Sequence, residues 1–320
     1  MSVVLCTHNP NAARLQRAID ALAVQTLPES DWELILVDNA STFPVSKAGF
    51  RVPSNVRFLD EAVAGLIHAR VAGVRNATKP LIVFCDDDNV LDREYLAIAV
   101  NIMSDHPTLG VASGKSKPEF EIEPEAWMSE FYGSLALYDH GNRIQIARGI
   151  ESGYPPFVGG GCGAVFRRQA LDRFLLQYAT SDGVMTGRRG AELSSGEDND
   201  IVLSILESGW EGGYFPQLEL LHLIAAGRLT RDYLARLNEG IAKSWVEVLH
   251  RHGLCPWKPS SPVLMPMQML RAFVRYKAWN GPAEYVRWRG ACGQFRGRAQ
   301  IWRAPARAGA YRSWIKSSES

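Results

Sequence analysis

The stretch "LIVFCDDDNVL" (Leu81–Leu91) runs from apolar residues into three consecutive aspartates, Asp86, Asp87 and Asp88. Its apolar part has the length and composition of a buried β-strand. Ligands of open parallel sheets bind beyond the carboxyl ends of the strands, where these aspartates are expected. Adjacent carboxylates repel one another in a partly desolvated site, and Mg²⁺ or Mn²⁺ relieves that repulsion because these ions prefer oxygen ligands. The stretch therefore predicts a metal–diphosphate site; a solvated acidic turn that caps a helix is the alternative.

The first 225 residues alternate short β-rich runs with segments of helical periodicity. We expect strands over residues 2–7, 33–38, around Phe58, 81–86 and 211–223, and helices over residues 11–25, 64–77, 93–104 and 197–209. Residues 163–171 predict a strand followed by a helix, and Asp92 is the expected N-cap of the helix after the aspartates. The Pro-punctuated segment 114–163 is expected to form long loops. This order predicts an α/β fold with a mostly parallel sheet covered by helices on both faces.

The totals exclude several classes of protein. The 320-residue chain has a formal net charge of +1, with 46% hydrophobic and 22% charged residues, as in ordinary globular proteins without a global attraction to nucleic acid. Its five cysteines include no CxxC pair, so neither a disulfide framework nor a structural zinc site is predicted. No apolar run reaches the ~18 residues of a membrane span, and the N-terminal run is too short for a signal peptide. We therefore expect a cytoplasmic protein.

A second acidic pair lies in "SSGEDNDIVL", where Glu197 and Asp198 begin a predicted helix after a loop rich in Gly and Ser. An aspartate held near a substrate hydroxyl can act as a general base, whereas helix capping is the alternative. His222 ends a later apolar run and is either a core histidine or a ligand. The glycines of "GGGCGAVF", among them Gly160 and Gly161, either allow a substrate close to the backbone or form a turn. No Lys-Ser/Thr follows them, which excludes a P-loop.

Six motifs occur in order along the first 225 residues: "VVLCTHN", "ELILVDNAST", "GLIHARVAGV", "LIVFCDDDNVL", "GGGCGAVFRRQAL" and "GEDNDIVLSILESGW". Together they resemble a family 2 glycosyltransferase of the GT-A (Rossmann-like) fold, in particular bacterial and cyanobacterial members thought to assemble surface polysaccharides. The resemblance implies an inverting transfer of a sugar from a nucleotide diphosphate sugar, with a UDP-sugar as the first expectation. It further implies a saccharide or lipid-linked saccharide acceptor, and Mn²⁺ or Mg²⁺ as the cofactor.

The resemblance also implies a role for each matching residue of this chain. Five residues would bind the nucleotide: Thr7, Asp38, Arg70, Asp86 and Asp87. Two would bind the metal: Asp88 and His222. Three would contact the donor sugar or the acceptor: Gly160, Gly161 and Glu197. Asp198 would be the catalytic base that deprotonates the acceptor hydroxyl.

The motifs predict a catalytic domain over residues 1–226, divided into a nucleotide-sugar half (1–113) and an acceptor half (114–226). Residues 227–320 form a second region, which begins with a long amphipathic helix predicted over residues 230–253. No QxxRW motif of processive synthases occurs in the chain. A single-addition enzyme is therefore expected.

The C-terminal region is basic and rich in tryptophan. From Arg271 to Lys316 it holds eleven Lys or Arg residues against one acid, and five of the nine tryptophans lie at or beyond Trp257. It is either a helical subdomain packed on the catalytic core or an interfacial region that contacts an anionic membrane surface. No nucleic-acid-binding motif accompanies the charge, so nucleic acid is not an expected partner.

Two other functions fit the same acidic clusters. A nucleotidyltransferase or another Mg²⁺-dependent phosphotransfer enzyme would share the nucleotide pocket, but it would release pyrophosphate instead of a nucleoside diphosphate. A non-catalytic sugar-nucleotide-binding protein on a degenerate fold would need to retain neither Asp88 nor Asp198. The sequence keeps both carboxylates, which favours the enzyme.

Overall fold

The computed structural model describes residues 1–180 and 196–302. By its internal packing the chain divides into two compact units. Unit 1 comprises the described residues of Met1–Glu123, Leu135–Gly187 and Glu197–Ala226. Unit 2 comprises the described residues of Pro124–Ser134, Arg188–Gly196 and Gly227–Ser320.

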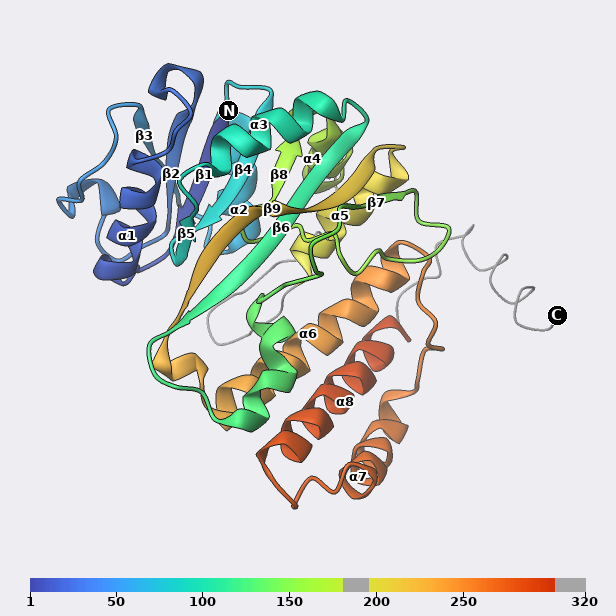
Figure 1. The fold of residues 1–320 in the computed structure, drawn as a ribbon. Coiled ribbons are helices and arrows are strands. Elements are labelled where there is room, and N and C mark those ends of the chain that lie inside the picture. The colour runs from blue at the N-terminus through green and yellow to red at the C-terminus, as the bar shows by residue number, and fades with distance from the viewer. Residues whose placement is uncertain (181–195, 303–320) are drawn as a thin grey trace. The chain divides into compact units, whose positions relative to one another are not determined.

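Unit 1 is built on a nine-stranded sheet in the described part of the chain (Figure 1). Its strands are β1 (Ser2–Thr7), β2 (Glu33–Asn39), β3 (Val56–Glu61), β4 (Leu81–Asp86), β5 (Asn89–Leu91), β6 (Leu109–Phe120), β7 (Gln145–Arg148), β8 (Val165–Arg167) and β9 (Glu211–Ile224). The order is β3-β2-β1-β4-β8-β6-β9-β5, and β7 also pairs with β9. The first four strands in this order are parallel, whereas β8 is antiparallel to β4 and β6. The sheet is therefore mixed, with a parallel half that carries the aspartate triplet.

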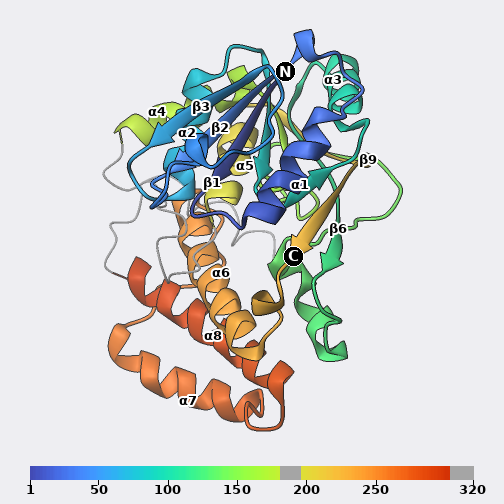
Figure 2. The same cartoon turned by 90° about the vertical axis from the view of Figure 1, so that its left-hand side faces the viewer.

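Helices cover both faces of this sheet, which confirms the expected α/β class. On one face, α1 (Ala12–Ala23) and α3 (Tyr95–Asp105) share a core with Val3 and Leu5 of β1. On the other face, α2 (Leu66–Asn76), α4 (Asp172–Thr180) and α5 (Glu197–Glu207) share a core with Val4 and Cys6 of the same strand. Side chains alternate along a strand, so one apolar run supplies both cores. Figure 2 shows α1 and α2 on opposite sides of β1.

The expected loops over residues 114–163 are wrong for residues 114–120 and 145–148, which form strands. β6 is a 12-residue strand that pairs with β9 and β8, and β7 adds a further strand. Ser113, Lys115 and Ser116 are buried in β6, so its sequence lacks the apolar run that marks a strand. Pairing with neighbouring strands, not local propensity, determines this strand. At Gly114 the backbone of β9 passes so close that any side chain would collide with Leu218.

The expected N-cap of the third helix is also wrong. α3 begins at Tyr95, and its N-cap position is Glu94, which makes no side-chain capping bond. Asp92 lies two residues earlier, where its carboxylate accepts a hydrogen bond from the Glu94 amide at 2.9 Å. Its own carbonyl accepts from the Tyr95 amide at 3.0 Å. Asp92 therefore stabilises the turn that precedes the helix.

Unit 2 contains three described α-helices, α6 (Arg231–Arg251), α7 (Met265–Arg275) and α8 (Pro282–Ile301). The Thr230 side chain caps α6, as its sequence pattern allows. α8 lies against α6 at Gly293, where an added Cβ would collide with the Glu239 carbonyl. Buried Glu239 of α6 also pairs with Arg289 and Arg296 of α8. Among the residues described, no helix combines the length and the apolarity needed to cross a membrane.

The amino ends of the parallel strands are joined by one carboxylate, Glu33 of β2. It accepts hydrogen bonds from the Ser2 hydroxyl at 2.6 Å and from the Thr78 amide at 2.7 Å, and it pairs with Arg57 at 2.9 Å. Burial alone would raise the pKa of Glu33, but these partners outweigh it and lower the pKa to about 2. Glu33 therefore connects β1, β2, β3 and the turn before β4.

Glu33→Gln is expected to lower the free energy of unfolding at pH 7 by about 1–3 kcal/mol, because charged hydrogen bonds are lost. The contribution of Glu33 to the free energy of unfolding is fully present above the pKa that Glu33 has in the unfolded chain, near 4.5. It is lost as the pH falls toward the folded-state pKa of about 2. Denaturant unfolding at pH 7 and near pH 2.5 should therefore show a difference between variant and wild type that shrinks in acid. Glu94→Gln, at an exposed glutamate, is the control and should leave stability within about 0.5 kcal/mol. An equal difference at both pH values would contradict this account.

Candidate active site

The carboxyl ends of three parallel strands bring the polar residues of the sequence motifs to one edge of the sheet. In the register of β1 and β2, Thr7 lies opposite Asp38. In the register of β1 and β4, Cys6 lies opposite Asp86. This edge is where ligands of open parallel sheets bind.

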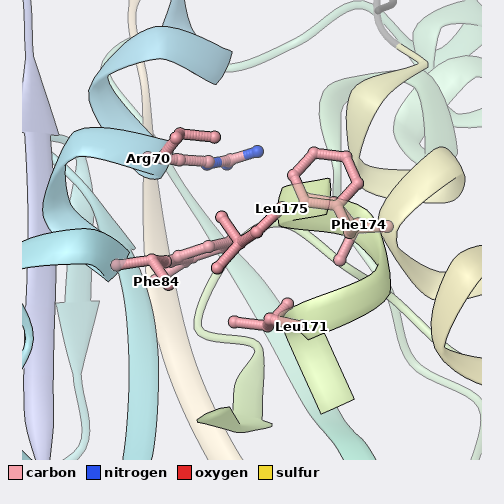
Figure 3. Close-up of a pocket in the computed structure, with 8 residues that line it drawn as sticks. Arg70, Phe84, Leu171, Phe174 and Leu175 are labelled. Atoms are coloured by element: carbon pink, nitrogen blue, oxygen red, sulfur yellow. The ribbon is translucent and has the colours of Figure 1, made fainter. Parts of the chain in front are cut away.

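Arg70 of α2 lies beneath this edge and is only 2% exposed. Its guanidinium lies over the Phe84 ring, 5.0 Å from the centroid. A small pocket beside it is lined by apolar side chains, among them Leu171, Phe174 and Leu175 (Figure 3). Because Arg70 supplies the one charge of that lining, the pocket suits no diphosphate and is a gap in the apolar layer.

Two carboxylates from distant parts of the chain meet Arg70. Its Nη1 donates to Asp198 Oδ1 in a close ion pair, and its Nη2 lies 3.4 Å from Asp86 Oδ1. Burial alone would lower the pKa of Arg70, but Asp198 and Asp86 raise it well above its ordinary value. The guanidinium therefore remains charged, and it offsets the repulsion between these two acids.

The glycine loop packs directly against Asp198. A Cβ at Gly160 would collide with the Asp198 carbonyl, and a Cβ at Gly161 would lie 2.5 Å from Asp198 Oδ2. Asp198 lies in the first turn of α5, as the sequence pattern predicts. The absence of side chains at these two glycines therefore leaves the space that the Asp198 carboxylate occupies.

Asp87 is bonded to the end of the neighbouring strand β1. The Thr7 hydroxyl donates to Asp87 Oδ2 in a short hydrogen bond. Burial, followed by the charge of Asp88, raises the pKa of Asp87 to about 7, although the Thr7 bond opposes the rise. The ionised form of Asp87 is therefore disfavoured, and a cationic or hydrogen-bonding ligand beside it would favour that form.

Asp88 and His222 come together through the pairing of β5 with β9. The His222 Nε2 atom lies 3.3 Å from Asp88 Oδ2, and His222 is 3% exposed. In the antiparallel register, His222 lies opposite Asn89. The side-chain amide group of Asn89 donates to Asp88 Oδ1 at 3.1 Å, and the side-chain oxygen of Asn89 accepts from the backbone amide of Asp86 at 3.2 Å. Asn89 thus fixes the turn that presents Asp88.

A divalent cation fits this pair of side chains. Within residues 1–180 and 196–302, no group of three His, Cys, Asp or Glu side chains forms a complete metal cage. Asp88 and His222 supply one oxygen and one nitrogen close enough to ligate a single ion. Mg²⁺ and Mn²⁺ sites commonly use one or two protein ligands and take the others from phosphate and water. The donor set therefore suits a cation that binds together with a diphosphate.

The other expected site residues occupy different surroundings. The two carboxylate oxygens of Asp38 accept from the Ser41 amide at 3.2 Å and the Val45 amide at 2.8 Å, so they order the loop after β2. Glu197 is buried in the first turn of α5, beside Asp198, and its charge acts on Arg70.

Sequence reasoning missed several residues of this edge. Cys162 Sγ lies 3.7 Å from Asp86 Oδ2, and burial raises the pKa of its thiol well above the ordinary value. The Tyr154 hydroxyl bonds to Asn199, one residue after Asp198, at 2.7 Å. Asn89 follows the triplet directly, so its position in "DDDN" was the one available signal. The contacts of Cys162 and Tyr154 join distant segments and leave no local pattern.

Comparison with known proteins gives the class of this fold and site. Residues 2–175, more than half of the chain, match the family described as "Glycosyl transferase family 2". The chain belongs to this family, which confirms the resemblance found in the sequence, and it is a glycosyltransferase by class. The matched range includes the aspartate triplet but not Asp198 or His222. A search of the curated proteins finds no match.

Many solved structures are similar in fold, among them the following two. One is the mannosyltransferase PcManGT from Pyrobaculum calidifontis in complex with GDP-Man and Mn²⁺, at 19% identity and a TM-score of 0.52. The similarity covers 89% of this chain and 72% of that one. The other is TarS from S. aureus, at 13% identity and a TM-score of 0.50. This similarity covers 94% of this chain and 55% of the TarS chain. At these identities the similarity establishes the fold alone.

Gly161→Ala is expected to lower kcat of sugar transfer by about 100-fold, because the new methyl group displaces the Asp198 carboxylate by about 1 Å. Gly159→Ala is the matched control, since its Cβ would have its nearest neighbour, Ser113 Cβ, at an ordinary 3.6 Å. Steady-state kinetics of both variants, with thermal unfolding to confirm folding, make the comparison. Equal rates for the two variants would show that the position of Asp198 does not limit transfer.

Proposed function

We propose that this chain is an inverting, metal-dependent glycosyltransferase that moves a sugar from a nucleotide diphosphate sugar to an acceptor hydroxyl. One observation carries the proposal: two carboxylates near the carboxyl ends of the parallel strands, Asp88 and Asp198, have separate sets of partners. Asp88 faces His222, whereas Asp198 faces Arg70 and the glycine loop. Displacement of a nucleoside diphosphate needs two such groups, one on the leaving-group side and one on the acceptor side.

The first carboxylate serves the donor. Asp88 and His222 would hold the divalent cation, and Thr7, Asp38, Asp86 and Asp87 would face the nucleotide. When bound, the cation supplies Lewis-acid stabilisation of the negative charge that grows on the leaving diphosphate. PcManGT, which shares the fold, is described with GDP-Man and Mn²⁺. A UDP-sugar remains the first expectation for this chain, and a GDP-sugar is the alternative to test.

The second carboxylate serves the acceptor. Asp198 would accept the proton of the acceptor hydroxyl while its oxygen attacks the anomeric carbon. Attack in line with the departing diphosphate inverts the configuration at that carbon. Gly160 and Gly161, which pack against Asp198, and the adjacent Glu197 would contact the donor sugar or the acceptor.

Arg70 supports the base. Its burial and its two ion pairs hold one oxygen of Asp198, which fixes the direction of the carboxylate. We therefore assign to Arg70 the positioning of Asp198 in addition to the nucleotide contact expected from the sequence.

The family resemblance supports a proposal for the acceptor and the pathway. We propose a saccharide or lipid-linked saccharide acceptor in the cytoplasm, in the biosynthesis of a polysaccharide or glycoconjugate. Residues 1–226 would be the catalytic domain, with residues 1–113 for the nucleotide sugar and 114–226 for the acceptor. Membership of the glycosyltransferase family favours this function over nucleotidyl transfer.

Calorimetric titration tests the donor site. UDP, GDP and dTDP are titrated into the protein with Mn²⁺, and again with EDTA. One nucleotide is expected to bind, and EDTA should weaken its binding by roughly 10- to 100-fold, because the cation shields the diphosphate charge from the aspartates. His222→Ala should weaken the Mn²⁺-dependent part of the affinity, whereas Glu94→Gln, at an exposed residue, should not.

The product of turnover distinguishes the two enzymatic functions. A glycosyltransferase releases a nucleoside diphosphate, and a nucleotidyltransferase releases pyrophosphate. Nucleotide binding that is equally tight in Mn²⁺ and in EDTA would overturn metal dependence. No binding of any of the three nucleotides would overturn the donor class.

A further inference from the structure

Helix α7 of unit 2 has one face that is packed against α8. The Trp288 indole of α8 donates a hydrogen bond to the Met269 carbonyl at 3.0 Å. The rings of Phe273 and Trp288 are T-shaped at 5.1 Å, and Ala272 between these contacts is buried. Within unit 2, α7 lies beside α8 and away from α6 (Figures 1 and 2). These contacts fix which side of α7 faces outward.

The opposite face of α7 is apolar and exposed. Five large apolar side chains make up this α7 outer face, with exposures of 85, 47, 44, 65 and 58%: Val263, Leu264, Met267, Leu270 and Val274. Most of them recur at spacings of three, four and seven residues, so they form one stripe along the helix and the turn before it. Contiguous exposed apolar surface of this kind marks an interaction site.

Basic residues border the stripe, and an exposed tryptophan follows the helix. Arg271, Arg275 and Lys277 are exposed, and Trp279 just beyond the helix is 60% exposed. Residues 248–283 contain no Asp or Glu at all. The α7 outer face is thus apolar in the middle and positive at its flank, without a neighbouring acid in the sequence.

We propose that the α7 outer face binds the surface of an anionic lipid bilayer, with the helix axis in the membrane plane. The apolar stripe would enter the boundary of headgroups and acyl chains, where Trp279 is favoured as well. Arg271 and Arg275 can extend their stems along the stripe and place their guanidinium groups among the lipid phosphates. Each basic residue near an anionic surface strengthens binding by about fivefold.

Charge argues against two other occupants of this face. A second copy of the chain would bring the same basic flank against itself in a two-fold interface, and like charges would repel. Residues 303–320 carry four basic residues and one acid, so their charge does not complement the flank either. An anionic bilayer complements both the apolar stripe and the positive flank.

Vesicle co-sedimentation of the full chain tests the proposal. The probes are vesicles of phosphatidylcholine alone and of phosphatidylcholine with 30% phosphatidylglycerol, at about 0.1 M and 0.5 M salt. The protein is expected to bind the anionic vesicles. Its binding to vesicles of phosphatidylcholine alone should be at least about tenfold weaker, and its binding to the anionic vesicles should be weaker at high salt. No donor, metal or acceptor enters the assay, so the result is independent of the proposed sugar transfer.

Two double variants separate the apolar and the electrostatic contributions. Leu270→Gln with Val274→Gln should weaken binding at least about tenfold. Arg271→Gln with Arg275→Gln should weaken it by roughly 25-fold, and only on anionic vesicles. The matched controls lie in unit 1 and should bind as the wild type does. They are Val24→Gln with Leu176→Gln, at exposed apolar residues, and Arg93→Gln with Arg143→Gln, at exposed arginines.

Three outcomes would overturn the proposal. The wild type does not sediment with anionic vesicles; the control variants lose as much binding as the variants of the α7 outer face; or sedimentation velocity shows a dimer that Leu270→Gln with Val274→Gln dissociates. The last result would assign the face to a second copy of the chain. Circular dichroism of each variant confirms that α7 remains folded.

Discussion

The buried charge of Arg70 is the constraint on which the candidate site depends. Two aspartates from elements far apart in the sequence, Asp86 and Asp198, converge on this one guanidinium, and the first-turn acid Glu197 lies within its field. Without a counter-charge, that number of carboxylates at a half-buried sheet edge would repel, and the site would open or take up protons. With it, two acids are compensated, and Asp87 and Asp88 are left beside the place where a cation can bind together with a diphosphate.

The carboxylates at the two ends of the parallel strands differ in how well their charges are compensated. At their amino ends, Glu33 is satisfied by Ser2, Thr78 and Arg57, so its charge is fully compensated and contributes to folding. At their carboxyl ends, burial and the charge of Asp88 raise the pKa of Asp87, so its charge is compensated less well than that of Glu33. Incomplete compensation costs stability, and folded proteins accept such a cost chiefly where a ligand completes the site.

The local sequence pattern predicted the strands and helices whose burial gives a regular spacing of apolar residues. β1, β2 and β4 each contain an uninterrupted apolar run, because burial on both faces of a sheet leaves a direct signature in the sequence. α5 also begins at Glu197, as expected. β6 escaped prediction because its buried residues include Ser113 and Lys115. Their side-chain partners, Gly213 and Asn142 among them, lie far along the chain. The pair between Arg70 and Asp198 spans 128 residues, so no spacing rule could have found it.

In the proposed reaction Asp88 acts on the donor, as a ligand of the cation, and Asp198 acts on the acceptor, as the base. The most direct measurement compares Asp88→Asn with Asp198→Asn, each isosteric with the wild type, for Mn²⁺-dependent nucleotide binding and for sugar transfer. The account predicts that Asp88→Asn loses metal-dependent binding, whereas Asp198→Asn keeps it and loses about 10²- to 10⁴-fold in transfer rate. Sugar transfer at the wild-type rate by Asp198→Asn would contradict the account.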